Sequence, residues 1–192
     1  MDDFWLLIKM GFQHVWDWQG YDHLLFLAAL CLPFAATQWK KLLVLVTVFT
    51  LGHSLSLILA TYGVVRVNLT WIEFLIPLSI LLTALYNIVW ASKTKFSSTL
   101  IPMVVTLFFG IIHGFGFASY FDLIKDSDSP IGVSLLAFAI GIEFAQLLLA
   151  LFVLVLNVLV IHLFKSSRRD WLLVGSSIII GILLPILINR LP

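Results

Sequence analysis

The residues of this chain best suited to chemistry are a few acidic and histidine side chains inside long apolar segments. They are Asp22, His23, His53, His113 and Glu143. An ionisable side chain in hydrocarbon carries a large free-energy cost, so within a membrane it indicates a functional site. Imidazole and carboxylate groups are also the usual protein ligands of divalent transition metals such as Ni²⁺, Co²⁺ and Zn²⁺. The sequence therefore predicts an intramembrane metal site formed by these five residues.

Each candidate ligand also has an alternative role. His53 and His113 can form hydrogen bonds between helices without a metal. Asp22 can orient a neighbouring histidine, or it can cap the helix that it opens. Glu143 can be a proton-linked carboxylate instead. His14 is the least secure candidate ligand, because a solvated surface histidine is an equally good interpretation of this position.

The composition of the chain is that of an integral membrane protein. Of its 192 residues, 61% are hydrophobic and 11% are charged, whereas about a quarter of a soluble domain is charged. A spanning helix needs about 20 apolar residues. Five clear segments of this kind cover residues 42–62, 71–91, 99–117, 133–163 and 171–188. The shorter segment 23–36 can span only if its polar start lies inside the bundle, and we count it as the first of six spans.

We therefore predict an all-α fold, a polytopic transmembrane helical bundle in a single domain, residues 1–192. Within it, residues 1–19 form an interfacial segment and residues 20–190 form the bundle. Apolar and aromatic side chains recur at helical spacing in residues 4–18, which is typical of an amphipathic helix anchored in the headgroup region by tryptophan. The alternative is a simple extension of the first span.

The distribution of basic residues predicts the orientation in the membrane. With six spans, one side carries seven Lys and Arg residues and the other carries four. The seven are Lys40, Lys41, Lys93, Lys95, Lys165, Arg168 and Arg169, and the four are Lys9, Arg66, Lys125 and Arg190. Cytoplasmic loops are enriched in Lys and Arg, so we expect both termini on the outer side of a bacterial inner (cytoplasmic) membrane. A net charge of only +1 gives no electrostatic support for nucleic-acid binding.

Small residues beside the histidines predict close helix packing. Gly52 precedes His53, and Gly110 and Gly114 flank His113. Glycines let helices approach closely in lipid, and the same approach would bring metal ligands together. At about 1.5 Å per residue, all the candidate ligands that lie on predicted spans fall in the outer half of the membrane.

A second polar feature lies on the segment 71–91. Ser79, Thr83 and Asn87 recur every four residues, so they share one helix face that runs toward the cytoplasmic end. This face can line a polar path inward from the metal site. Ordinary hydrogen bonding between helices by small polar residues explains it equally well.

Four motifs resemble those of the HupE/UreJ family, in particular its second branch. They read Gly20-Tyr-Asp-His-Leu-Leu-Phe-Leu, Phe49-Thr-Leu-Gly-His-Ser-Leu-Ser-Leu, Gly110-Ile-Ile-His-Gly-Phe-Gly-Phe-Ala and Gly141-Ile-Glu-Phe-Ala-Gln. The resemblance covers roughly residues 11–150. The chain departs from the pattern at one point: a histidine usually precedes the motif Asp by six residues, whereas His14 precedes Asp22 by eight.

The resemblance implies nickel or cobalt uptake, with metal ligands at Asp22, His23, His53 and His113. The function predicted first is therefore a divalent transition-metal permease, with the metal ion (Ni, Co or Zn) and the lipid bilayer as its partners. The second is an intramembrane zinc-dependent hydrolase or acyl-transfer enzyme that acts on a lipid or lipoprotein, with Glu143 as general base or acid. The third is a metal-free accessory subunit that joins a partner in a membrane complex.

Overall fold

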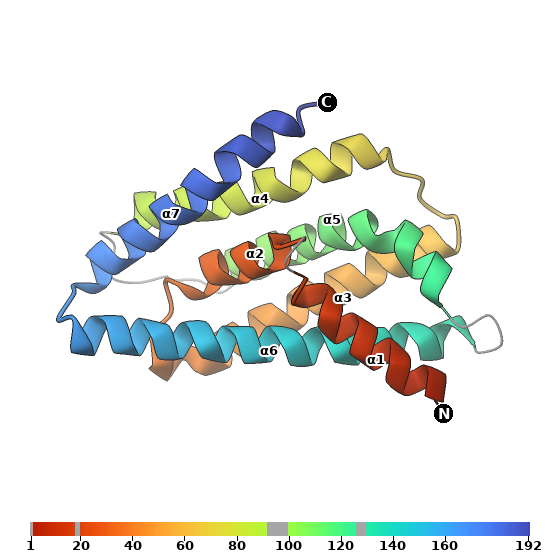
Figure 1. Cartoon of the computed structure of the whole chain (residues 1–192), viewed down its shortest axis with the longest axis horizontal. Coiled ribbons are helices and arrows are strands. Elements are labelled where there is room, and N and C mark those ends of the chain that lie inside the picture. Colours follow the sequence, from red (N-terminus) through yellow and green to blue (C-terminus); the bar gives the residue numbers. More distant parts are fainter. Residues whose placement is uncertain (1, 18–19, 92–99, 126–129) are drawn as a thin grey trace.

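Seven α-helices and one short 3₁₀ helix make up the computed structural model, which describes residues 2–17, 20–91, 100–125 and 130–192. The helices are α1 (Asp2–Val15), α2 (Asp22–Cys31), η1 (Ala36–Gln38), α3 (Trp39–Thr61), α4 (Leu69–Trp90), α5 (Leu100–Ile124), α6 (Ile131–Leu163) and α7 (Arg168–Asn189). Figure 1 shows them side by side in a bundle, with no strand in the described part of the chain. The predicted all-α transmembrane class is confirmed.

Five helices are long and apolar enough to cross a bilayer, namely α3, α4, α5, α6 and α7. The prediction of six spans needs a correction at α2, which has 10 residues and is about half as long as a span. Figure 1 shows where these two short helices lie: α1 runs from one end of the bundle to its middle, and α2 runs from there toward the other end. The helix ends at Val15 and restarts at Asp22, so α1 is not an extension of the first span.

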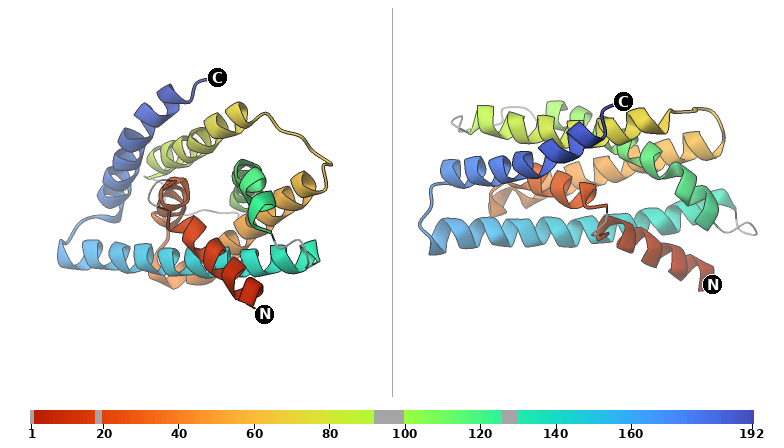
Figure 2. Two further views of the ribbon diagram at one scale, coloured as in Figure 1. Left: turned by 45° about the vertical axis from the view of Figure 1, so that its right-hand side comes forward. Right: turned by 45° about the horizontal axis from the view of Figure 1, so that its top comes forward.

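α1 is amphipathic as expected, and its apolar face is covered by protein. Leu7, Gly11 and Val15 are buried, whereas Trp5 and Lys9 on other faces are exposed. The buried face packs against α6, as the crossing of these two helices in both views of Figure 2 makes clear. The placement of residues 1–19 in the headgroup region stays a prediction.

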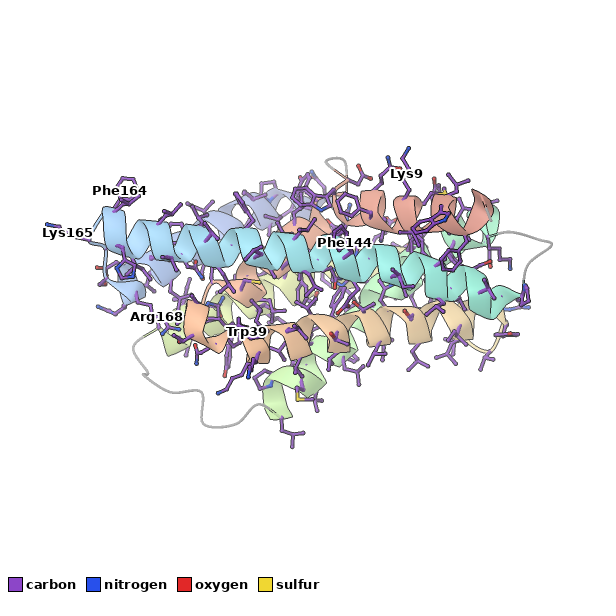
Figure 3. All side chains as sticks on the ribbon, turned by 90° about the horizontal axis from the view of Figure 1, so that it is seen from below. Lys9, Trp39, Phe144, Phe164, Lys165 and Arg168 are labelled. Carbon is purple, nitrogen blue, oxygen red and sulfur yellow. The ribbon has the colours of Figure 1, made fainter. Side chains whose placement is uncertain are left out.

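We call the two ends of the bundle the terminus side and the opposite side. The terminus side holds residues 62–68 and 190–192, and the opposite side holds residues 32–38 and 164–167. On the terminus side, Arg190 Nη1 at the end of α7 donates to the Glu73 carbonyl at the start of α4, 3.5 Å away. Lys93 and Lys95 lie outside the described residues, but Lys165 and Arg168 lie together at the opposite side in Figure 3.

The turn between α2 and α3, at the opposite side of the bundle, is held by side chains of α6 and α7. Asn157 Nδ2 on α6 donates to the Phe34 carbonyl at 3.2 Å, and its Oδ1 accepts from Trp171 Nε1 at 2.8 Å. Arg168 donates to the carbonyl of Pro33. These bonds satisfy backbone oxygens of a non-helical stretch, which would otherwise be costly in an apolar environment. They fix the chain just after α2, and therefore the position of α2 in the bundle.

Candidate metal centre

The histidines come together because α3 and α5 cross in van der Waals contact. A Cβ atom at Gly52 would lie 2.5 Å from the Leu107 carbonyl oxygen, closer than real Cβ atoms approach. A Cβ at Gly110 would overlap the Phe49 carbonyl, and one at Gly114 would overlap the His53 carbonyl. Only glycine fits at these three positions. The predicted close packing beside His53 and His113 is confirmed.

A second glycine contact places the N-terminal helix. A Cβ at Gly11 on α1 would overlap the Phe138 carbonyl on α6, and a Cβ at Gly141 would overlap the Ile8 carbonyl. The two backbones therefore touch at this crossing, and the last turn of α1 is carried into the bundle. His14 lies in that turn. The glycine of the Gly141-Ile-Glu motif thus has a packing role that the sequence alone did not reveal.

Four histidine side chains from four helices form one cluster. The ligand nitrogens of His14, His23 and His53 all lie within 4.8 Å of one another. Their ring centroids are separated by 4.6 Å for His14–His23, 5.7 Å for His14–His53 and 5.9 Å for His23–His53. The His113 ring joins the cluster through His23, at 5.2 Å. The least secure candidate in the sequence, His14, therefore lies inside the compact group.

The unpartnered nitrogens of this cluster match the needs of a metal ion. Nε2 of His14, His23 and His113, and both ring nitrogens of His53, are buried with no hydrogen-bond partner in the described structure. Leaving a buried polar atom unsatisfied costs about 1–3 kcal/mol. Nδ1 of His113 does have a partner, since it lies 2.8 Å from the Phe109 carbonyl oxygen. Donation to that oxygen fixes the neutral tautomer and leaves Nε2 as a ligand atom.

Asp22 lies beside the cluster rather than in its compact group. It opens α2 without acting as a side-chain cap, and it lines a cavity of about 630 Å³ together with His14, His23 and His113. Asp17 and Tyr120 also line this cavity. Asp22 Oδ2 is 3.6 Å from Nη1 of Arg190. Tyr120 lies in the last part of α5, toward the terminus side, so the cavity extends from the histidines toward that side of the bundle.

Glu143 lies apart from the histidines. Its Oε1 accepts a hydrogen bond of 2.6 Å from Thr47 Oγ1, and its Oε2 contacts Thr50 Oγ1. Thr50 precedes His53 by three residues on α3, so this contact lies about one helical turn toward the opposite side. Glu143 is half-buried, at the boundary between α3 and α6. The structure therefore assigns its carboxylate to a separate polar group and not to the histidine cluster.

Three phenylalanines close the cluster on the opposite side, and we call Phe26, Phe49 and Phe109 the aromatic floor. All three are buried, and Phe26 stacks on Phe49 with ring centroids 4.9 Å apart. The ring of Phe49 lies 5.2 Å from that of His113 and 5.9 Å from that of His23. Below the floor is a second cavity of about 290 Å³, lined by Phe26 and Phe109.

The aromatic floor was not predicted, although a signal for it exists. Each phenylalanine lies one turn from a histidine on the same helix: Phe26 follows His23 by three, and Phe49 and Phe109 precede His53 and His113 by four. Since α2 runs in the opposite direction to α3 and α5, all three offsets point the same way. Helix direction together with spacing would have revealed the layer.

The polar face of α4 is explained by local hydrogen bonds. Ser79 Oγ donates to the Ile76 carbonyl at 2.7 Å, and Thr83 Oγ1 donates to the Ser79 carbonyl at 2.9 Å. Asn87 Nδ2 donates to the Ala29 carbonyl of α2 at 2.7 Å. These bonds favour the packing interpretation over a continuous polar path. Thr83 and Asn87 do line the second cavity, but most of its other lining residues are apolar.

Comparison with known proteins decides the family. The model of the family described as "HupE / UreJ protein" matches residues 1–189, nearly the whole chain. The chain belongs to the HupE/UreJ family. No curated protein and no solved structure matches it. The match extends beyond the 11–150 region of the resemblance, through α7 as well as α1. In this family member, three of the four motifs contain a glycine at a helix crossing, and three contain a clustered histidine.

Proposed function

We propose that this protein is a divalent transition-metal permease whose cargo is Ni²⁺ or Co²⁺. The observation that carries the proposal is the set of buried histidine nitrogens without partners in the described structure, beside a cavity that His14, His23 and His113 line. The family is generally associated with nickel and cobalt transport, which supports the same cargo. His14, His23, His53 and His113 would bind the ion, and Asp22 would attract it to the mouth of the cavity.

The arrangement of cavities is that of a carrier open to one side. The larger cavity holds the ion site, and the aromatic floor separates it from the smaller cavity below. A carrier must close one access route before it opens the other. We infer that Phe26, Phe49 and Phe109 form the closed inner gate, because an ion cannot shed its hydration to pass a dry aromatic layer. With both termini outside, this conformation faces outward.

Uptake of radiolabelled Ni²⁺ or Co²⁺ into proteoliposomes tests the proposal. Wild-type protein should accumulate the ion, and His53→Ala should abolish uptake. Phe49→Ala should change the transport rate while leaving equilibrium metal binding nearly intact, because it removes a ring from the floor and no ligand. Phe152→Ala, on the exposed face of α6, is the control and should have no effect. Absence of uptake by the wild type with any divalent ion would reject the permease.

A zinc-dependent intramembrane hydrolase is the second candidate, and the shape of the site favours it. A cavity of about 630 Å³ is far larger than a metal ion needs, and the floor below is dry. Bound zinc supplies a water molecule that is acidified for attack on an ester or amide. Asp22, at the rim of the same cavity, would then accept the proton of that water molecule, because Glu143 lies about one helical turn farther toward the opposite side. Hydrolysis of a fluorogenic lipid ester by the zinc-loaded wild type, absent in His53→Ala, would support this candidate.

A further inference from the structure

Glu143 is a carboxylate in a membrane-spanning helix with hydroxyl partners and no basic partner. Its oxygens contact Thr47 Oγ1 and Thr50 Oγ1. Neither ion pair found in the described residues includes it, since these join Lys125 to Asp122 and Arg190 to Asp22. A charge in an apolar medium is costly unless it is paired with an opposite charge. The contacts of Glu143 stabilise the carboxylate only in part, because a hydroxyl carries no net charge.

The Thr50 hydroxyl has more acceptor oxygens around it than it has hydrogens to donate. Its hydroxyl has one hydrogen, but three acceptors surround it: Oε2 of Glu143, Oε1 of Gln146 at 3.0 Å and the Val46 carbonyl at 3.3 Å. One hydrogen can serve one of them well. If that hydrogen serves Glu143, the Gln146 oxygen faces Thr50 Oγ1 without a hydrogen between them, whereas the Val46 carbonyl already accepts the helical N–H of Thr50. A positive charge placed among these oxygens would remove the repulsion.

Gln146 adds a buried amide to this polar group. Its side chain is fully buried, and its Oε1 is directed to Thr50 while its Nε2 has no partner in the described structure. This orientation leaves a buried donor unsatisfied, which costs about 1–3 kcal/mol. Such an orientation is favourable if the carbonyl oxygen is needed as a ligand.

We propose that Glu143, Thr47, Thr50 and Gln146 form a binding site for a monovalent cation, either Na⁺ or H⁺. All the ligand atoms are oxygens, which suit a hard cation and not the transition metals that imidazole prefers. One carboxylate with neutral hydroxyl and amide oxygens makes a neutral complex with a single positive charge. The site is distinct from the histidine cluster in its ligand type and in its depth.

The position of the cation site suggests what it does, and this part of the proposal rests on the proposed transport function. Thr50 and His53 lie one turn apart on α3, and Glu143 lies two residues from Gly141, the contact point of α1. Occupation of the site joins α3 to α6, the two helices that position His53 and His14. Figure 3 views this pair of helices directly. The cation would thereby couple an ion gradient to metal uptake.

Thermal unfolding of the purified metal-free protein in detergent tests the site. In wild type, replacing choline chloride with NaCl should raise the unfolding midpoint if the cation is Na⁺. Lowering the pH in choline chloride should raise it, relative to Glu143→Gln, if the cation is H⁺. Glu143→Gln should lose the response, because the neutral amide keeps the shape and needs no counter-ion. Equal responses of wild type and Glu143→Gln to both sodium and acid would overturn the proposal.

A second pair of variants covers the case in which Glu143→Gln does not fold. Thr50→Val removes one ligand oxygen and should shift the sodium or acid titration to higher cation concentration. Thr106→Val removes an equally buried hydroxyl from α5 and should leave the titration unchanged. Identical titrations of Thr50→Val and wild type would also overturn the site. No nickel or cobalt is present, so a failure of metal uptake leaves this test intact.

Discussion

At the residue scale, the decisive property of this protein is a set of imidazoles without hydrogen-bond partners. Buried histidines in most proteins satisfy their ring nitrogens with backbone or side-chain groups. Here five buried ring nitrogens of the four clustered histidines have no partner in the described structure. The rings converge from four helices. A metal ion would bind one nitrogen of each ring, which is why the cluster supports a binding site and not a packing role.

Removal of one clustered histidine should weaken metal binding. His53→Ala should lower the affinity for Ni²⁺ or Zn²⁺ at least about tenfold, the lower range known for loss of an outer-shell partner. His162→Ala is the matched control, because His162 is exposed near the end of α6. Isothermal titration calorimetry of the purified variants measures both. Equal affinities of His53→Ala and His162→Ala would show that the cluster does not bind the ion.

Arg190 should slow the entry of a divalent cation. Its guanidinium lies 3.6 Å from Asp22 Oδ2, at the rim of the cavity that leads to the histidines. Arg190→Gln removes a repulsive charge, so metal association should become severalfold faster at low ionic strength and change little at high salt. Stopped-flow binding measures the rate, with Lys165→Gln on the opposite side as the control. An unchanged rate at low salt would place the entry route elsewhere.

At the scale of the elements, two glycine crossings position the site. Gly52, Gly110 and Gly114 bring α3 and α5 together, and Gly11 and Gly141 bring α1 against α6. Between them, these contacts place His53, His113 and His14. α1 ends at Val15 and α2 begins at Asp22, and His14 and His23 lie at these two facing helix ends. Interrupted helices provide binding groups at mid-depth in many transporters.

Enlarging a glycine at a crossing should destabilise the protein and displace a histidine. Gly141→Ala would place a methyl group against the Ile8 carbonyl, so we expect a cost of about 1–3 kcal/mol, typical of overpacking, together with weaker metal binding. Gly132→Ala, in the first turn of the same helix and with open space around it, should instead leave the stability unchanged or slightly higher. Thermal unfolding and metal titration compare the two. A Gly141→Ala protein as stable as Gly132→Ala would show that the crossing can relax.

At the scale of the whole molecule, the two sides of the bundle differ in access and in charge. The larger cavity extends toward the terminus side. At the opposite side, Asn157 and Arg168 form hydrogen bonds to the turn between α2 and α3. Lys40, Lys165 and Arg168 belong to that opposite side. If this basic side faces the cytoplasm, as the sequence predicts, the larger cavity opens outward, as the proposed importer requires.

The orientation can be checked by cysteine labelling. In a Cys31→Ala background, a cysteine at Val64 on the terminus side should react with a membrane-impermeant maleimide in intact cells. A cysteine at Ser167 should react only after the cells are opened. Both positions are exposed, so access to the reagent decides the result. The reverse pattern would place both termini in the cytoplasm and turn the cavity inward.

Composition and spacing by themselves determined the fold class, the five long spans and the candidate ligands. Hydrocarbon tolerates only backbone that is hydrogen-bonded internally, so long apolar runs must be helices. Buried ionisable groups are costly enough to mark a site in the sequence. The span boundaries were less accurate: α5 continues to Ile124, seven residues beyond the predicted end at residue 117, so His113 lies near the middle of its helix.

Only the tertiary structure decided which candidates belong together. In the sequence His14 ranked below Asp22 and Glu143 as a candidate ligand, but helix rotation and crossing place His14 in the cluster, Asp22 at its rim and Glu143 with the threonines. Spacing within a helix constrains which side chains share a face. It cannot say how one helix is rotated against another, because that depends on contacts such as Gly11 with Phe138 and Gly52 with Leu107, between residues far apart in the chain.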